Sequence, residues 1–141
     1  MYDANVGFTV KAISKIRKHT IIAEYVGEVT TVEKSGASSS DSLMTLLNTG
    51  DDRTSLIIDP TRTGNVARFV SGVNNRSLLS KKMTNVRSRR FALDGKCHVV
   101  LFTWKDINAG ELLHYDYNAG MQGKSIEEWA KSGFYDTSAF F

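Results

Sequence analysis

The chain has 141 residues, of which 41% are hydrophobic and 23% are charged, and its formal net charge is +3. These values are typical of one globular domain with a real core, and no run of about 18 apolar residues predicts a membrane span. The single cysteine, Cys97, excludes internal disulfides and a thiolate zinc cluster, and it favours a reducing, intracellular compartment. The mild positive charge does not by itself indicate a nucleic-acid partner.

The first part of the chain predicts strands. A leading glycine and alternation predict a strand over Val6–Ile13, with a close backbone approach at Gly7. A strand so near Met1 is expected of a catalytic piece cut from a longer protein, and no secretory leader precedes it. The β-branched run Thr20–Val29 predicts a second strand, and the small residues of Glu33–Asp41 predict a flexible loop.

Two β-hairpins are predicted further along. The first pairs Ser42–Leu47 with Arg53–Asp59 through a polar turn. The second pairs Phe91–Leu93 with His98–Trp104 through a turn at Asp94-Gly95. Many short strands, little helix and no internal repeat together predict a compact, mostly β domain.

Between the hairpins, Ile57–Asn75 places polar residues among apolar ones. Gly64-Asn65 predicts a turn that tolerates positive φ, Arg68-Phe69 joins a cation to a ring, and Asn74-Asn75 adds side-chain amides. This pattern has two interpretations: a wall that lines a ligand site, or a partly buried connection whose amides cap backbone groups.

A basic stretch, Leu78–Arg90, follows. It is either a solvated face or a surface that contacts DNA phosphates beside a chromatin substrate. The cations in question are Lys81, Lys82, Arg87, Arg89 and Arg90.

The last predicted strand, Glu111–Tyr117, places Tyr115 and Tyr117 on one face. With Tyr25, these phenols could line a narrow channel, because phenol oxygens accept hydrogen bonds from an amine and ring faces attract a cation. The alternative is that they are core residues with hydroxyls satisfied at the edge of the core.

Other chemistry is less favoured. The three histidines show no metal-ligand spacing, so no metal site is predicted, and Cys97-His98 would face opposite sides of a strand. Ser125 begins a capping box that predicts a short helix from Ile126 to about Lys131, before an aromatic tail that folds back.

An ordered set of motifs resembles the SET-domain protein-lysine methyltransferases over roughly residues 6–118. Within that family it is most similar to the plant trithorax-related enzymes that monomethylate lysine-27 of histone H3. The motifs are Gly7-Phe8-Thr9-Val10, Glu24–Val29, Ile58-Asp59, Gly64–Phe69, Asp106-Ile107, Gly110-Glu111-Leu112 and Tyr115–Asn118.

The resemblance implies a SET fold of small β-sheets with few short helices and a C-terminal pseudoknot. It implies a catalytic domain over residues 1–120 and a closing segment over residues 121–141. It also implies that S-adenosylmethionine is the cofactor, S-adenosylhomocysteine the product, and that no metal takes part. By the same match, Tyr117, Tyr115 and Tyr25 are catalytic. The implied cofactor-binding residues are Gly7, Phe8, Thr9, Arg68, Phe69, Ser71, Gly72 and Tyr117.

The activity implied is methylation of a histone H3 tail or nucleosome in the nucleus, with monomethylation of lysine-27 because Tyr115 crowds a second methyl group. Two alternatives are a methyltransferase for a non-histone lysine and a SET-like module that binds chromatin without catalysis.

This sequence departs from the family pattern at several positions. Thr9 replaces a glycine of the first motif, and Ser71-Gly72 replaces an Asn-His pair. A serine can supply only part of the hydrogen bonding of an asparagine. Asn85 is aligned with the family's later asparagine, and Trp129 or Phe134 is expected to cover the adenine in place of a zinc-bound segment.

Overall fold

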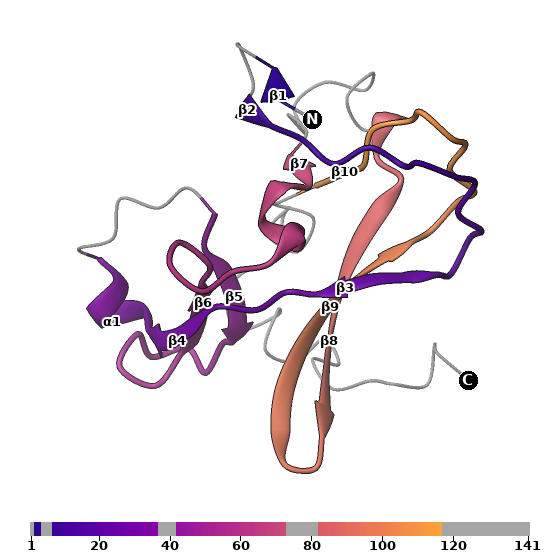
Figure 1. The fold of residues 1–141 in the computed structure, drawn as a ribbon. Coiled ribbons are helices and arrows are strands. Elements are labelled where there is room, and N and C mark those ends of the chain that lie inside the picture. The colour runs from indigo at the N-terminus through magenta and orange to yellow at the C-terminus, as the bar shows by residue number, and fades with distance from the viewer. Residues whose placement is uncertain (1, 4–6, 37–41, 73–81, 117–141) are drawn as a thin grey trace. The chain divides into compact units, whose positions relative to one another are not determined.

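The computed structural model describes residues 2–3, 7–36, 42–72 and 82–116. The described chain is mostly β, in small sheets with few short helices, as predicted (Figure 1). It divides into two compact units. Unit 1 comprises Met1–Ala23, Val66–Arg89 and Val100–Ala119, and unit 2 comprises Glu24–Asn65, Arg90–Val99 and Gly120–Phe141.

Unit 2 is built on a three-stranded antiparallel sheet. Its strand order is β4 (Glu28–Thr31), β6 (Leu56–Asp59) and β5 (Met44–Leu47). Strands β5 and β6 form the first predicted hairpin. Their turn is held by hydroxyls, because Ser55 is buried and its Oγ accepts from the amide of Thr49 at 3.1 Å.

The predicted strand over residues 20–29 is two strands. Its first part is β3 (Ile21–Glu24) and its last part is β4, with a break around Gly27. A Cβ on Gly27 would lie 2.3 Å from the carbonyl oxygen of Asp59, so the chain crosses the end of β6 where only glycine fits. Period-two patterning carries no sign of this close approach.

Part of the predicted loop at residues 33–41 is helical. Helix α1 (Val32–Ser35) begins after Thr31, whose hydroxyl accepts from the amide of Lys34 at 3.3 Å. The sequence does not predict this N-capped helix, because a helix of one turn is too short to show a hydrophobic period. Residues 37–41 lie outside the described part.

A second three-stranded sheet has the order β3, β9 (Lys96–Thr103) and β8 (Val86–Leu93), and each of its strands contributes residues to both units. The β8–β9 hairpin turns at Asp94 and Gly95, with φ of 50° and 72°, as the sequence predicted. Strand β8 starts at Val86, earlier than expected, so the basic residues from Arg87 onward lie on a strand.

The strands at the edge of unit 1 are much shorter than predicted. Within the described residues 7–13 the strand is β2 (Gly7–Phe8), which pairs with β1 (Tyr2–Asp3), and within the described residues 111–116 it is β10 (His114–Tyr115). The rest of these segments meet through an isolated antiparallel bridge between Lys11 and Leu112, whose hydrogen bonds run from Leu113 N to Val10 O at 2.8 Å and from Ala12 N to Glu111 O at 2.9 Å. The core of this unit includes Val70, Val86, Leu101, Ile107 and Leu113.

Strand β10 pairs in parallel with β7 (Ser71–Gly72), which follows the 3-10 helix η1 (Val66–Phe69). Residues 112–114 are bound from two directions. Ser71 N donates to Leu113 O at 3.2 Å, and Asn85 N donates to His114 O at 3.0 Å. Both ends of the connection over residues 72–85 therefore hold the same C-terminal segment, which is the described part of the expected pseudoknot.

At two positions glycine is required for a reason opposite to the one predicted. Gly7 has φ of +81°, and a Cβ added there would meet no atom within 4 Å, so this glycine serves its backbone conformation. Gly64 has no positive φ, but a Cβ there would lie 2.4 Å from the oxygen of Pro60, so it serves a close approach.

The predicted helix at residues 126–131, the aromatic tail and the closing segment 121–141 lie outside the described residues. None of the helices in the described ranges has the length and apolar character needed to cross a bilayer.

Candidate active site

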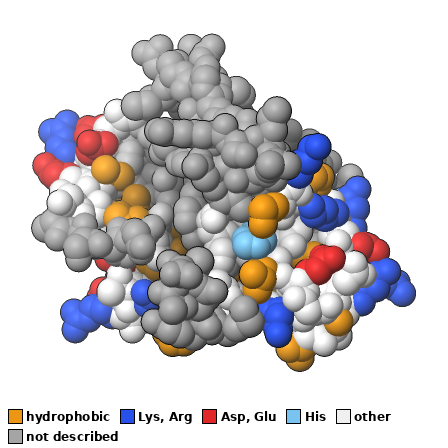
Figure 2. Space-filling model, turned by 90° about the horizontal axis from the view of Figure 1, so that it is seen from above, with side chains coloured by type: hydrophobic (Ala, Val, Ile, Leu, Met, Phe, Trp, Pro, Cys, Tyr) orange, Lys and Arg blue, Asp and Glu red, His pale blue; other side chains and the backbone are white. Residues whose placement is uncertain are grey.

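Three predicted cofactor residues come together in unit 1. The ring of Phe8 on β2 meets the ring of Phe69 on η1 edge to face, with centroids 5.7 Å apart. The guanidinium carbon of Arg68 lies 5.1 Å from the Phe69 centroid. Phe8 is 63% and Phe69 38% exposed. On the face drawn in Figure 2, hydrophobic side chains lie exposed among charged and polar ones. Two accessible rings beside a cation form a surface that can bind a flat heteroaromatic ring or a carboxylate.

Thr9 lies next to this cluster in the chain and is 6% exposed. Its buried position is compatible with a structural role for the residue that replaces a family glycine. The cofactor contact expected of Thr9 and of Gly7 stays a prediction.

The β7–β10 pairing brings Ser71 and Gly72 beside the last strand. Ser71 is in register with His114, and Gly72 is in register with Tyr115. Leu113 is 1% and Tyr115 4% exposed, while residues 112, 114 and 116 are less buried, so the predicted alternation along this strand is confirmed.

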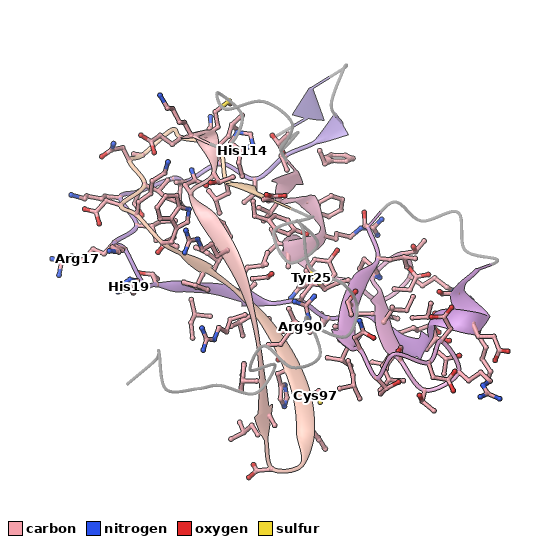
Figure 3. All side chains as sticks on the ribbon, turned by 180° about the vertical axis from the view of Figure 1, so that it is seen from behind. Arg17, His19, Tyr25, Arg90, Cys97 and His114 are labelled. Carbon is pink, nitrogen blue, oxygen red and sulfur yellow. The ribbon has the colours of Figure 1, made fainter. Side chains whose placement is uncertain are left out.

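Two polar atoms at these paired positions are buried without a hydrogen-bond partner among the residues that the structure describes. They are Ser71 Oγ and His114 Nδ1, and His114 is labelled in Figure 3. Residues in register on parallel strands project to the same side of the sheet, so both atoms belong to one side of the β7–β10 pair. Burial also lowers the pKa of His114 from its usual 6.5, which favours a neutral imidazole.

An unsatisfied buried polar atom costs about 1–3 kcal/mol, so such atoms in a folded protein call for an explanation. A bound group that hydrogen-bonds to Ser71 or His114 would recover part of that cost. Unit 1 thus carries both buried polar atoms that a ligand could satisfy and an exposed aromatic cluster that a flat ring could stack on.

The sequence gives little indication of the structural role of Asn85. It is 4% exposed, its Nδ2 donates to Leu112 O at 2.8 Å, and its Oδ1 accepts from His114 N at 2.8 Å. One side chain therefore fixes the backbone on both sides of Leu113 and aligns β10. The sequence feature that points to this role is an amide side chain directly before an apolar strand residue, Val86, in a basic segment.

The three predicted catalytic tyrosines are not all described. Tyr117 lies outside the described residues, while Tyr115 belongs to unit 1 and Tyr25 to unit 2. Tyr25 is 2% exposed, and its hydroxyl donates to Ser42 O at 2.6 Å. Both described phenols are buried, as channel or core residues would be, and their convergence stays a prediction.

The basic residues of β8 have different surroundings. Arg87 stacks on Trp104, with its guanidinium carbon 4.4 Å from the ring centroid. Arg90 is half-buried in unit 2, where its Nε donates to Thr45 O and its Nη2 contacts the sulfur of Met44. Arg90 therefore acts as a structural cation, which is not what the prediction of a DNA contact assumed. Lys81 lies outside the described residues.

His98 has a structural environment in unit 2. Its Nδ1 is 2.6 Å from Oε1 of Glu24, and its ring stacks on Phe91 with centroids 5.3 Å apart. Cys97 is partly exposed. Within the described ranges, no group of three or more His, Cys, Asp or Glu residues is arranged to hold a metal ion.

Comparison with known proteins gives consistent results. Residues 7–118 match the SET domain family. A probable histone-lysine N-methyltransferase ATXR5 of Ricinus communis is 44% identical over 118 residues, which is 84% of this chain and 32% of that protein. The histone-lysine N-methyltransferase ATXR6 of Arabidopsis thaliana is 43% identical over 119 residues, covering 84% of this chain and 34% of that protein. The chain thus spans about a third of the length of these curated relatives.

Solved structures agree. A crystal structure of ATXR5 in complex with histone H3.1 monomethylated on an arginine has a TM-score of 0.82 at 44% identity, covering 84% of this chain and 55% of that one. An ATXR5 SET domain in complex with histone H3 dimethylated on an arginine has a TM-score of 0.83 at 41% identity, covering 90% and 60%. The family match covers most of the chain, and its order of motifs agrees with the described fold. The chain belongs to the SET-domain family.

Proposed function

We propose that the chain is the catalytic domain of an S-adenosylmethionine-dependent histone-lysine N-methyltransferase. The observation that carries this proposal is the SET-domain match over residues 7–118, with relatives at 43–44% identity that bear this activity in their names. The geometry of unit 1 is compatible with it, because the residues expected to bind the cofactor include an exposed aromatic pair, Phe8 and Phe69, and Ser71, whose buried hydroxyl lies in register with His114.

The cofactor would be held by residues of η1, β2 and β7. Phe8 and Phe69 offer faces for the adenine, Arg68 a cation for the carboxylate, and Ser71 a free hydroxyl. Gly7, Thr9, Gly72 and Tyr117 complete the proposed set. Bound S-adenosylmethionine supplies an electrophilic methyl group on a cationic sulfur and leaves as S-adenosylhomocysteine.

The tyrosines would prepare the substrate lysine. A free lysine has a pKa near about 10.4 and must lose a proton before its lone pair can attack. Buried surroundings such as those of Tyr25 and Tyr115 disfavour the ammonium form, and phenol oxygens can accept hydrogen bonds from the amine and orient it. The contribution of these residues would thus be mainly desolvation and alignment.

The product would be monomethyl-lysine, at lysine-27 of histone H3. The buried hydroxyl of Tyr115 takes space that a second methyl group needs, or holds a water in its place. The histone substrate is supported by the two solved ATXR5 complexes, both of which contain histone H3. A nucleosomal substrate would place the protein in the nucleus.

One observation favours a second function, a SET-like module that binds chromatin without catalysis. Ser71-Gly72 stands where the family has an Asn-His pair, and Ser71 Oγ has no hydrogen-bond partner within the described part of the chain. If that change removed cofactor binding, histone recognition could remain. Calorimetry with S-adenosylmethionine separates the two functions, because only the enzyme binds it.

The test of substrate and activity uses a radiolabelled methyl-transfer assay on recombinant nucleosomes. Histones that each have a single lysine replaced by arginine would locate the modified position, and mass spectrometry would count the methyl groups. We expect labelling of histone H3 that is lost when lysine-27 is replaced. Labelling of a non-histone protein alone would favour the other methyltransferase class, and no labelling with no cofactor binding would contradict the enzyme.

A further inference from the structure

The two units carry opposite charge. The described residues of unit 1 include nine lysines and arginines against four acidic residues, a net of +5. Those of unit 2 include five against seven, a net of −2. A positive excess concentrated on one small unit creates a potential that attracts an anionic partner to that unit.

Two of the cations of unit 1 pack against the indole ring of Trp104. Arg87 lies 4.4 Å and Lys105 Nζ 5.3 Å from the ring centroid, and Lys105 Nζ also donates to the carbonyl of Lys82 at 2.9 Å. Among the described residues, none of these three cations forms a salt bridge. The indole therefore orders two like charges that form no ion pair with the described residues, with Glu111 attracting Lys105 only at longer range.

The basic turn at residues 15–18 continues the same surface. Ile16 forms a backbone bridge with Ile107, and Asp106 accepts from Lys18 N at 2.9 Å and pairs with Lys15 Nζ at 3.2 Å. These contacts hold the turn beside the residue that follows Lys105. Arg17 is exposed and projects away from the ribbon in Figure 3.

We propose that this surface binds the phosphate backbone of the nucleosomal DNA next to the histone tail on which the enzyme acts. The proposal rests on the proposed function and adds a second point of attachment to the substrate. The surface consists of Lys15, Arg17, Lys18, Lys82, Arg87 and Lys105 around Trp104.

DNA fits this surface better than a short acidic peptide does. The cations are spread over three segments of the chain, so a partner with regularly repeated charge can meet several of them at once. Among the described residues of this surface only Lys82 is helical, so the described part offers no helix that could lie along a groove and read bases, and the expected binding is independent of sequence.

The test compares two triple variants with equal loss of charge. Arg17→Gln/Lys18→Gln/Lys105→Gln removes charge from the surface, and the control, Lys34→Gln/Arg62→Gln/Lys96→Gln, removes exposed charge from unit 2. Binding of each protein to a mixed-sequence DNA duplex is measured from about 50 to 200 mM salt. Thermal unfolding of both variants verifies that they are folded.

We expect the surface variant to bind DNA at least about tenfold more weakly and its salt slope to fall by about 3, while the control changes by less than about twofold. The ratio of methylation rates on nucleosomes and on free H3 peptide should fall only in the surface variant. Equal weakening in both variants, or no weakening, would overturn the proposal.

Another outcome also contradicts it: slower nucleosome methylation with unchanged affinity for free DNA would indicate an acidic histone surface as the partner. The proposed enzymatic function fails separately, if the parent protein does not methylate the free H3 peptide. DNA titration gives its answer in either case, because it does not depend on methyl transfer.

Discussion

Unit 2 and unit 1 differ in how the polar groups of their backbones are hydrogen-bonded. In unit 2, β4, β6 and β5 are four-residue strands that form an antiparallel sheet with one register shift between β5 and β6, and hydroxyls such as that of Ser55 close the turn. In unit 1, β2, β7 and β10 have two residues each, and one side chain, Asn85, supplies hydrogen bonds that a longer sheet would provide. The unit that keeps unpaired polar atoms is also the one that carries most of the proposed cofactor residues.

This difference has a physical basis. A regular ladder consumes the polar groups of the backbone and leaves no open position for a ligand. Short strands held by side chains satisfy fewer polar groups, and within the described residues Ser71 Oγ and His114 Nδ1 are buried without a hydrogen-bond partner. Such an arrangement costs stability, so unit 1 should respond to substitutions differently from unit 2.

The largest expected effect is in the regular unit. Gly27→Ala would place a Cβ 2.3 Å from Asp59 O, a backbone atom that cannot move without distorting β6. We expect a loss of about 3 kcal/mol of unfolding free energy in urea titrations. The control is Gly50→Ala, where φ is +82° but no atom lies within 4 Å, and which should cost about 1 kcal/mol. Equal losses would show that the approach of Gly27 to Asp59 is not what breaks the strand.

Asn85→Ala tests the side chain that replaces a ladder in unit 1. It removes two buried side-chain hydrogen bonds and leaves Leu112 O and His114 N unpaired, so we expect a loss of about 2–3 kcal/mol. Hydrogen exchange should show faster exchange at β10 before it changes in β4–β6. Asn108→Ala, which removes an exposed bond to Glu111, should cost less than about 0.5 kcal/mol. A neutral Asn85→Ala would contradict the role assigned to this residue.

Two serine-to-alanine substitutions, one in each unit, are expected to change stability in opposite directions. Ser71→Ala removes a buried hydroxyl without a partner, so stability should rise by about 1 kcal/mol, while affinity for S-adenosylmethionine falls about fivefold in calorimetry. Ser55→Ala removes a hydroxyl bonded to Thr49 N, so stability should fall by about 1 kcal/mol. If Ser71→Ala left cofactor affinity unchanged, Ser71 would not be a cofactor residue.

The smallest effect is a pH dependence that belongs to unit 1. Burial lowers the pKa of His114 below its usual 6.5, so on acidification the unfolded chain takes up a proton before the folded one does. Stability from this group is complete above about pH 6.5 and falls as the pH drops toward the folded-state pKa. The pKa values of Asp106 and Glu111 are lowered by hydrogen bonds, so these carboxylates titrate at lower pH.

The measurement is the melting temperature at about pH 7.5 and pH 5.5. His114→Phe should show a smaller decrease on acidification than the parent protein, and His19→Asn, at an exposed position with φ of 65°, should behave like the parent. An unchanged decrease in His114→Phe would assign the acid sensitivity to another group.

Local signals predicted part of the fold correctly. The β5–β6 and β8–β9 hairpins follow from strand patterns and turn residues that lie close together in the chain, such as Asp94-Gly95. The break at Gly27 and the need for glycine at position 64 arise from contacts with Asp59 and Pro60. The first contact joins residues distant in the sequence and the second lies within an irregular turn, and neither leaves a periodic trace in a single sequence.

The candidate site shows the same limit. Family resemblance brought out Phe8, Arg68 and Phe69, and the described structure places the three side chains together. It did not reveal how Asn85 holds β10, because that function depends on a fold in which residues 112–114 return beside residue 85. The unpaired atoms of Ser71 and His114 likewise become apparent only once β7 and β10 are paired.

The most direct test of the central claim is mass spectrometry of histone H3 after exhaustive reaction with S-adenosylmethionine, for the parent protein and for Tyr115→Phe. Tyr115 is buried next to Gly72 in the β7–β10 pair, so removing its hydroxyl should make room for more methyl groups without disturbing the ladder. We predict monomethyl-lysine from the parent and a shift toward di- and trimethyl-lysine from the variant. Trimethyl-lysine as the main product of the parent, or no methyl transfer to any histone, would contradict the account.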